Sequence, residues 1–165
     1  MKKKNILIDA IEIIVTAIII TALLFNFVLI SARVNGSSMY PTLLDGDYGY
    51  SFVISKNIGI KRFDICVVDV DNKKLVKRVI GLPNETVSFL DNKLYINESQ
   101  IEDVVNEDVF TSDFSVTLSD NEYFCLGDNR EISKDSRFYG SFSKNDIVST
   151  HLFVLYPFDN FGFKK

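Results

Sequence analysis

The sequence predicts a mainly β protein, in which a single N-terminal transmembrane helix precedes a coiled β-sheet or barrel-like domain. The first reason is the 20-residue segment from Ile13 to Ala32, which contains no charged side chain. The second is a series of short runs rich in Val, Ile, Phe and Tyr, residue types that suit a pleated sheet, with turn residues between them. The third is that no long stretch after Ala32 repeats its apolar residues with the period of a helix.

The N-terminal segment has the length of a membrane anchor. A helix of about 20 residues rises roughly 30 Å, which matches the hydrocarbon core of a bilayer. Cleaved secretory signal peptides have a shorter apolar core of about 7–15 residues, so we expect a retained anchor, with a cleaved signal peptide as the alternative. Three Lys precede the segment and only Arg33 follows closely, which places the N-terminus in the cytosol. The expected division is a cytosolic N-terminus (1–12), an anchor in the cell membrane (13–32) and an extracytoplasmic domain (33–165).

The composition limits the classes of function. The chain has 165 residues, which is room for one ordinary domain and an appendage. Its formal net charge is −4, and residues 34–165 alone hold 14 Lys and Arg against 20 Asp and Glu. Such an acidic domain is a poor general binder of nucleic acid, so we expect no nucleic-acid partner. One His and two Cys cannot supply a two-His metal site or a disulfide framework, so we expect no metal ion.

The part after the anchor divides into several expected strands. Asp91-Asn92 forms a two-residue hairpin turn between two of them. Residues 98–119 are acidic and polar, and they predict either a surface excursion or a small extra lobe. Cys66 and Cys125 lie in apolar runs and are expected as small core residues, with a disulfide as the alternative. The expected strands are Tyr48–Ile54, Ile65–Val70, Leu75–Ile80, Thr86–Leu90, Lys93–Ile96, Tyr123–Leu126 and Ile147–Tyr156.

Three polar segments contain the residues that could do chemistry. Residues 35–42, NGSSMYPT, form a turn with two hydroxyls directly after the anchor. Residues 75–83, LVKRVIGLP, place Lys77 and Arg78 inside an apolar strand, where neighbours point to opposite faces. A buried lysine can lose its proton and become a base, but the pattern alone favours an edge strand with two exposed cations, because Lys and Arg are almost always exposed. Residues 127–137, GDNREISKDSR, have the composition of a loop stiffened by Arg–Asp pairs, or of an ordinary exposed polar loop.

Together, and in this order, the three segments resemble the conserved boxes of type I signal peptidase. That family has a serine box close to SGxSMxPT after an N-terminal anchor, then KRVxGxPGD, and later GDNRxxSxDSR. The resemblance is strongest to the short Gram-positive form with one anchor and a reduced β domain. One departure is Asn84-Glu85 in place of Gly-Asp, and Asn tolerates the positive φ that a turn glycine adopts.

The resemblance implies a Ser–Lys dyad. Ser38 matches the nucleophile and Lys77 the general base, and a free lysine needs desolvation to act as a base near neutrality. Ser133 matches the serine that hydrogen-bonds the lysine and fixes its direction. Two further residues, Asp135 and Arg137, match the pair that braces this loop.

The remaining matched positions are supporting ones. Asp128 matches the opening of the third box in a structural role. The position that supplies an extra oxyanion hydroxyl in some relatives is Gly36 here, so that donor is absent. Met39 follows the nucleophile and either lines the substrate pocket or packs in the core.

The resemblance implies a membrane-bound serine endopeptidase that removes signal peptides from exported preproteins. The expected partners are preprotein signal peptides as substrate and the lipid bilayer; we expect a monomer that needs no cofactor. An alternative is a specialised or non-catalytic relative that serves the assembly of surface pili. The presence of both Ser38 and Lys77 argues against the non-catalytic version.

Overall fold

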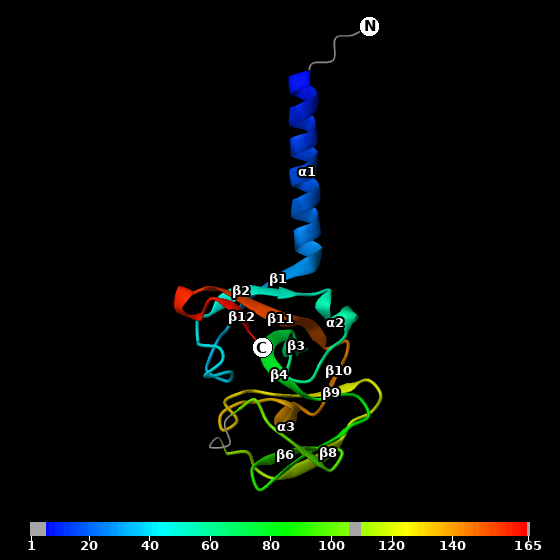
Figure 1. Cartoon of the computed structure of the whole chain (residues 1–165), viewed down its shortest axis with the longest axis vertical. Coiled ribbons are helices and arrows are strands. Elements are labelled where there is room, and N and C mark those ends of the chain that lie inside the picture. Colours follow the sequence, from blue (N-terminus) through cyan, green and yellow to red (C-terminus); the bar gives the residue numbers. More distant parts are fainter. Residues whose placement is uncertain (1–5, 106–109, 165) are drawn as a thin grey trace.

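The protein consists of an N-terminal helix and two antiparallel β-sheets. We analysed a computed structural model, which describes residues 6–105 and 110–164 (Figure 1). The helices are α1 (Ile6–Val28), α2 (Ser55–Ile58), α3 (Ser136–Tyr139) and the 3-10 turn η1 (Phe158–Asn160). The strands are β1 (Leu29–Arg33), β2 (Tyr48–Phe52), β3 (Ile65–Val70), β4 (Lys73–Gly81), β5 (Thr86–Leu90), β6 (Lys93–Ile96), β7 (Ser99–Ile101), β8 (Phe114–Thr117), β9 (Glu122–Leu126), β10 (Phe142–Ser143), β11 (Ile147–Tyr156) and β12 (Gly162–Lys164).

The larger sheet has eight strands and is open. Its order is β1-β2-β11-β3-β4-β9-β10, with β12 added beside β11, and its pairings are antiparallel. The end strands β1 and β10 do not pair with each other within the described residues. The mainly β prediction is therefore confirmed, whereas the expected barrel-like closure is wrong. The physical reason is that β10 has only two residues, too few to form a ladder along β1.

The smaller sheet forms a lobe of its own. It has four strands in the order β7-β6-β5-β8. The turn between β5 and β6 is Asp91-Asn92, and both residues have positive φ (49° and 62°), as a two-residue hairpin of this kind requires. The segment 98–119 supplies β7 and β8. Of the two alternatives left open for it, the small lobe is confirmed.

Helix α1 stands apart from the sheets. Figure 1 shows it extending away from the β-rich part, with β1 continuing directly from its end. Large apolar side chains along it are exposed, for example Leu7 (74%) and Ile18 (62%). The helix ends at Val28, so the last four residues of the expected anchor belong to β1. Judged by length and hydropathy, none of the helices in the described residues qualifies as bilayer-spanning.

The two cysteines are buried free thiols. Cys66 on β3 and Cys125 on β9 have their Sγ atoms 3.8 Å apart. Strand β4 lies between these strands, so their backbones are separated by roughly two strand spacings, about 9.6 Å. A disulfide needs Cα atoms within about 7 Å, which explains why the thiols remain unbonded. The predicted role as small core residues is confirmed.

Candidate active site

Ser38 and Lys77 lie in contact although 39 residues separate them in the chain. The Nζ of Lys77 donates a hydrogen bond to the Oγ of Ser38 over 3.0 Å. Lys77 lies within β4 and is only 2% exposed, whereas Ser38 is half-buried in the loop after β1. A hydroxyl beside a buried amine is the arrangement in which the amine can act as a base toward the hydroxyl.

The surroundings of Lys77 favour the neutral amine. Burial is the largest influence and lowers the pKa of Lys77 below its ordinary value of 10.5. The negative charge of Asp135 raises this pKa again, and the positive charge of Arg137 lowers it. The direction that prevails is downward, because the ammonium loses more solvation energy in this poorly hydrated site than the nearby Asp135 and Asp128 carboxylates and the Cys66 thiol restore.

The backbone around Ser38 is held from both sides. Gly36 has a φ of 86°, in the region that favours glycine, and its N–H donates to the Asp45 carboxylate over 2.7 Å. On the other side, the N–H of Asn129 donates to the Ser38 carbonyl over 3.0 Å. The Met39 side chain is fully buried in the apolar cluster beneath this loop. These contacts fix the position of the Ser38 hydroxyl relative to β4.

Ser133 lies near the Ser38–Lys77 pair but forms no hydrogen bond with either residue. Its Oγ is buried and has no hydrogen-bond partner among the described residues. Its backbone N–H donates to the Asn129 carbonyl over 3.1 Å, which keeps it on the same loop that contacts Ser38. The hydrogen bond to Lys77 that the resemblance implies is not formed in this structure.

Asp135 and Arg137 form a brace within the third segment. Asp135 is fully buried and accepts hydrogen bonds from Arg137 Nε and Nη2, each over 2.9 Å. It also accepts the Gly127 N–H over 3.0 Å, so one carboxylate ties together both ends of the loop. The Arg137 side chain reaches further and donates to the Arg130 carbonyl over 2.6 Å.

Two further ion pairs hold the same loop in place, and the partners in both pairs could not be identified from the sequence. Arg78 and Asp128 form a bidentate pair with N–O distances of 2.8 and 2.7 Å, and both are about 2% exposed or less. Arg130 forms a second bidentate pair with Asp103, over 2.6 and 3.0 Å. Because side chains alternate along a strand, the sequence could have indicated that Arg78 pairs with a buried carboxylate. It could not have identified which Asp or Glu supplies that carboxylate.

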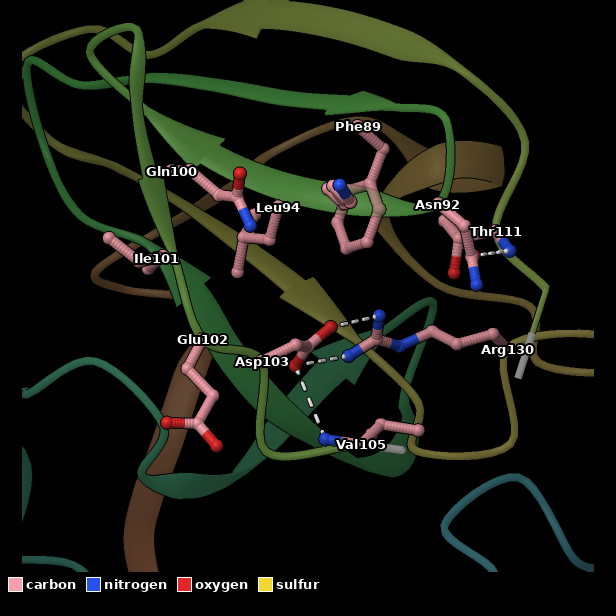
Figure 2. Close-up of a pocket in the computed structure, with 11 residues that line it drawn as sticks. Phe89, Asn92, Leu94, Gln100, Ile101, Glu102, Asp103, Val105, Thr111 and Arg130 are labelled. Carbon is pink, nitrogen blue, oxygen red and sulfur yellow. Dashed lines mark hydrogen bonds and ion pairs between the residues drawn. The ribbon is translucent and has the colours of Figure 1, made fainter. Parts of the chain in front are cut away.

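The Arg130–Asp103 pair lies in a cavity of the smaller lobe. This cavity measures about 240 Å³ and is lined mainly by β5, β6, β7 and the segments beside them. Figure 2 shows the two side chains facing each other across it, with the Val105 N–H also donating to Asp103. Neither member of the Ser38–Lys77 pair lines it. The pair therefore anchors the third segment to the smaller lobe rather than forming part of the dyad.

Gly127 leaves no room for a side chain, and we expect Gly127→Ala to impair activity. A Cβ at this position would lie 2.2 Å from the Ser133 Oγ and 2.4 Å from the Ser38 carbonyl oxygen. The Ser38 backbone would have to move, and a displacement of about 1 Å can cost roughly a hundredfold in rate. Steady-state kinetics should therefore show kcat reduced by about tenfold to a hundredfold, with the far-UV circular dichroism spectrum unchanged. Wild-type kcat in the variant would contradict this account of the packing.

Comparison with known proteins identifies the family. A family model described as signal peptidase, peptidase S26, matches residues 7–156. Signal peptidase I S of Bacillus subtilis is 40% identical over 172 residues, covering 96% of this chain and 93% of the relative. Signal peptidase I of Streptococcus pneumoniae is 34% identical, covering 80% and 84%. The crystal structure of a signal peptidase I from Enterococcus faecalis has 31% identity and a TM-score of 0.51, covering 56% of this chain and 96% of that chain.

The antiparallel scaffold and these relatives define the class as serine peptidases, which are hydrolases. Within that class, the chain belongs to the signal peptidase family, peptidase S26, and its relatives are signal peptidases I of the Gram-positive type. The family resemblance drawn from the three sequence segments is thereby confirmed.

Proposed function

We propose that this enzyme cleaves signal peptides from exported preproteins with Ser38 as nucleophile and Lys77 as general base. The observation that carries this proposal is the 3.0 Å contact between Lys77 Nζ and Ser38 Oγ, at a lysine whose pKa is lowered by burial. The name signal peptidase I of the relatives supports the substrate class.

The reaction begins with a proton transfer. The neutral amine of Lys77 accepts the hydroxyl proton of Ser38, and Oγ attacks the scissile carbonyl carbon. The backbone N–H of Ser38 is the expected oxyanion donor, and it makes no hydrogen bond to another described residue. Gly36 contributes no hydroxyl to this oxyanion.

The acyl-enzyme then forms and is hydrolysed. The Lys77 ammonium returns its proton to the leaving nitrogen, the C–N bond breaks, and the signal peptide remains as an ester on Ser38. Water attacks the ester while Lys77 takes its proton. The same proton then goes to Ser38 Oγ as the acid leaves, which restores the free enzyme.

We also propose that the enzyme works at a membrane, with α1 as a single-pass anchor and the N-terminus in the cytosol. Exposed apolar side chains on α1 support this, and so do exposed aromatic rings on β2 and in the C-terminal segment, whose strands β11 and β12 continue the sheet from β2. Figure 1 shows β1 and β2 at the end of α1. Aromatic side chains commonly lie at the boundary between lipid and water. The rings concerned are those of Tyr48, Tyr50, Tyr156, Phe158, Phe161 and Phe163.

The family resemblance implies substrates with small residues at −1 and −3, the last residue and the third-last residue before the cleaved bond. The test is cleavage of a preprotein with such a small-x-small site by the full chain in lipid vesicles. We expect a single cut after the small residue at −1, identified by mass spectrometry of the product. Ser38→Ala should leave the preprotein intact, whereas the matched control Ser37→Ala, at the exposed neighbouring serine, should cleave it. Protease added outside sealed vesicles should digest whichever domain faces outward and so report the topology. An intact preprotein in the presence of well-folded wild type would contradict the proposal.

A further inference from the structure

A groove of about 480 Å³ runs beside the candidate dyad, between β1 and the hairpin of β3 and β4. It reaches Asn35, three residues before Ser38, and Val76, the neighbour of Lys77. One of its walls is the end strand of the larger sheet, because β1 pairs only with β2. Within the described residues, no strand occupies the outer edge of β1, so the backbone groups on that edge can pair with an extended peptide.

The groove has an apolar floor and a cationic rim. The floor of the groove includes Ala32, Val67 and Val76. Ala32 and Val76 also contribute to the apolar cluster beneath the loop that contains Ser38. The exposed side chains of Arg33 and Lys74 also line it, and the lining contains no acidic residue. Two cations facing one groove stand out in a domain whose net charge is negative.

Both cations remain available to a ligand. Neither Arg33 nor Lys74 forms an ion pair with a described residue. Asp69 lies opposite Lys74 in the register of β3 and β4, yet no ion pair joins the two. By contrast, Arg62, Arg78, Arg130 and Arg137 are each paired with a carboxylate.

An extended peptide in this groove would present its side chains alternately to floor and rim. Successive residues of a strand point to opposite faces, so small residues at −1 and −3 directed at the floor leave the residue at −2 directed outward. Arg33 alternates with Ala32 along β1 in the same way and therefore lies at the rim. Lys74, two residues before Val76 on β4, shares the face of Val76 but is exposed, so it lines the groove where the groove opens to solvent.

We propose that Arg33 and Lys74 are specificity-determining residues that favour substrates with a carboxylate side chain between the two small residues of the cleavage site. This inference rests on the proposed function and adds a charge preference to it. A rim-exposed ion pair adds a modest, salt-sensitive amount to binding, so the preference acts mainly on kcat/KM for competing substrates.

The test uses three peptides that differ only at −2, with Asp, Asn or Lys between two alanines. They are cleaved by the full chain in neutral phosphatidylcholine vesicles, so that lipid charge does not contribute. Wild type should prefer the Asp peptide over the Lys peptide by roughly threefold to tenfold in kcat/KM at low salt, and by less at high salt. The double variant R33Q/K74Q should lose this preference. The matched control Lys73→Gln removes an exposed cation next to Lys74 that does not line the groove, and it should retain the preference.

The outcomes separate the two proposals. Equal kcat/KM for the Asp and Lys peptides would overturn the charge preference while leaving the peptidase assignment intact. A preference that persists in R33Q/K74Q would likewise overturn the role of these two residues. Failure of folded wild type to cleave any of the three, including the neutral Asn peptide, would instead contradict the proposed function and the inference built on it.

Discussion

Replacing Lys77 with methionine should reduce kcat for preprotein cleavage by roughly a thousandfold or more, because the variant keeps the length of the side chain but has no base. Lys77→Arg should be equally inactive, since a guanidinium does not lose its proton in a protein. The measurement is kcat from steady-state cleavage by the full chain in vesicles. Lys73→Met is the matched control, because Lys73 is exposed on the same strand, and it should cleave at the wild-type rate.

The pH profile of the wild type gives an independent test of the same role. Only the neutral amine can accept the Ser38 proton, so kcat/KM should rise with pH as the ammonium deprotonates and level off above the Lys77 pKa. Burial lowers that pKa below 10.5, which moves the rising limb to lower pH than for an exposed lysine. An activity that falls as pH rises through this range, or a Lys77→Met variant with near-normal kcat, would contradict the dyad.

Much of the fold could be predicted because the strands follow local rules. The ranges expected for β3, β5, β6 and β11 agree with the structure at both ends, since each is a β-branched or aromatic run bounded by turn residues. Asn84 adopts the positive φ (64°) expected of it in place of glycine. Most of the strands that were missed are short, such as β7, β10 and β12. The five-residue β1 was missed because its apolar residues were assigned to the anchor.

The residues of the candidate site could be named from the sequence, whereas most of their contacts could not. The three polar segments named Ser38, Lys77 and Asp135, and the structure brings all three into one region. The partners of the buried arginines were not predictable, because Asp103 lies in the polar connection between β7 and β8 and Asp128 lies in a loop. Which residues of such distant segments come into contact is decided by the whole fold rather than by the local sequence pattern. For the same reason the groove lined by Arg33 and Lys74 emerges only when the fold brings β1 and β4, which are not neighbours in the sheet, to line the same groove.

Breaking the Arg78–Asp128 pair should lower stability by about 3–5 kcal/mol, because removing one partner leaves the other charge buried and uncompensated. Asp128→Asn is the least disruptive change, since it keeps the shape of the side chain. Both members are about 2% exposed or less, and Arg78 also donates to the Phe63 carbonyl over 2.8 Å. The measurement is urea unfolding of the detergent-solubilised full chain, followed by circular dichroism.

Two comparisons separate this cost from a general effect of losing a carboxylate. Glu85→Gln disrupts the Arg62–Glu85 pair, whose side chains are 21% and 17% exposed, and it should cost only about 1 kcal/mol because solvent screens the pair. The double variant R78M/D128L should recover most of the loss, since an apolar pair of similar volume leaves no buried charge. An Asp128→Asn variant as stable as wild type would show that the pair contributes nothing. Because Asp128 directly precedes Asn129, whose N–H holds the Ser38 carbonyl, the same substitution tests whether the stability of this loop and the position of the nucleophile depend on one ion pair.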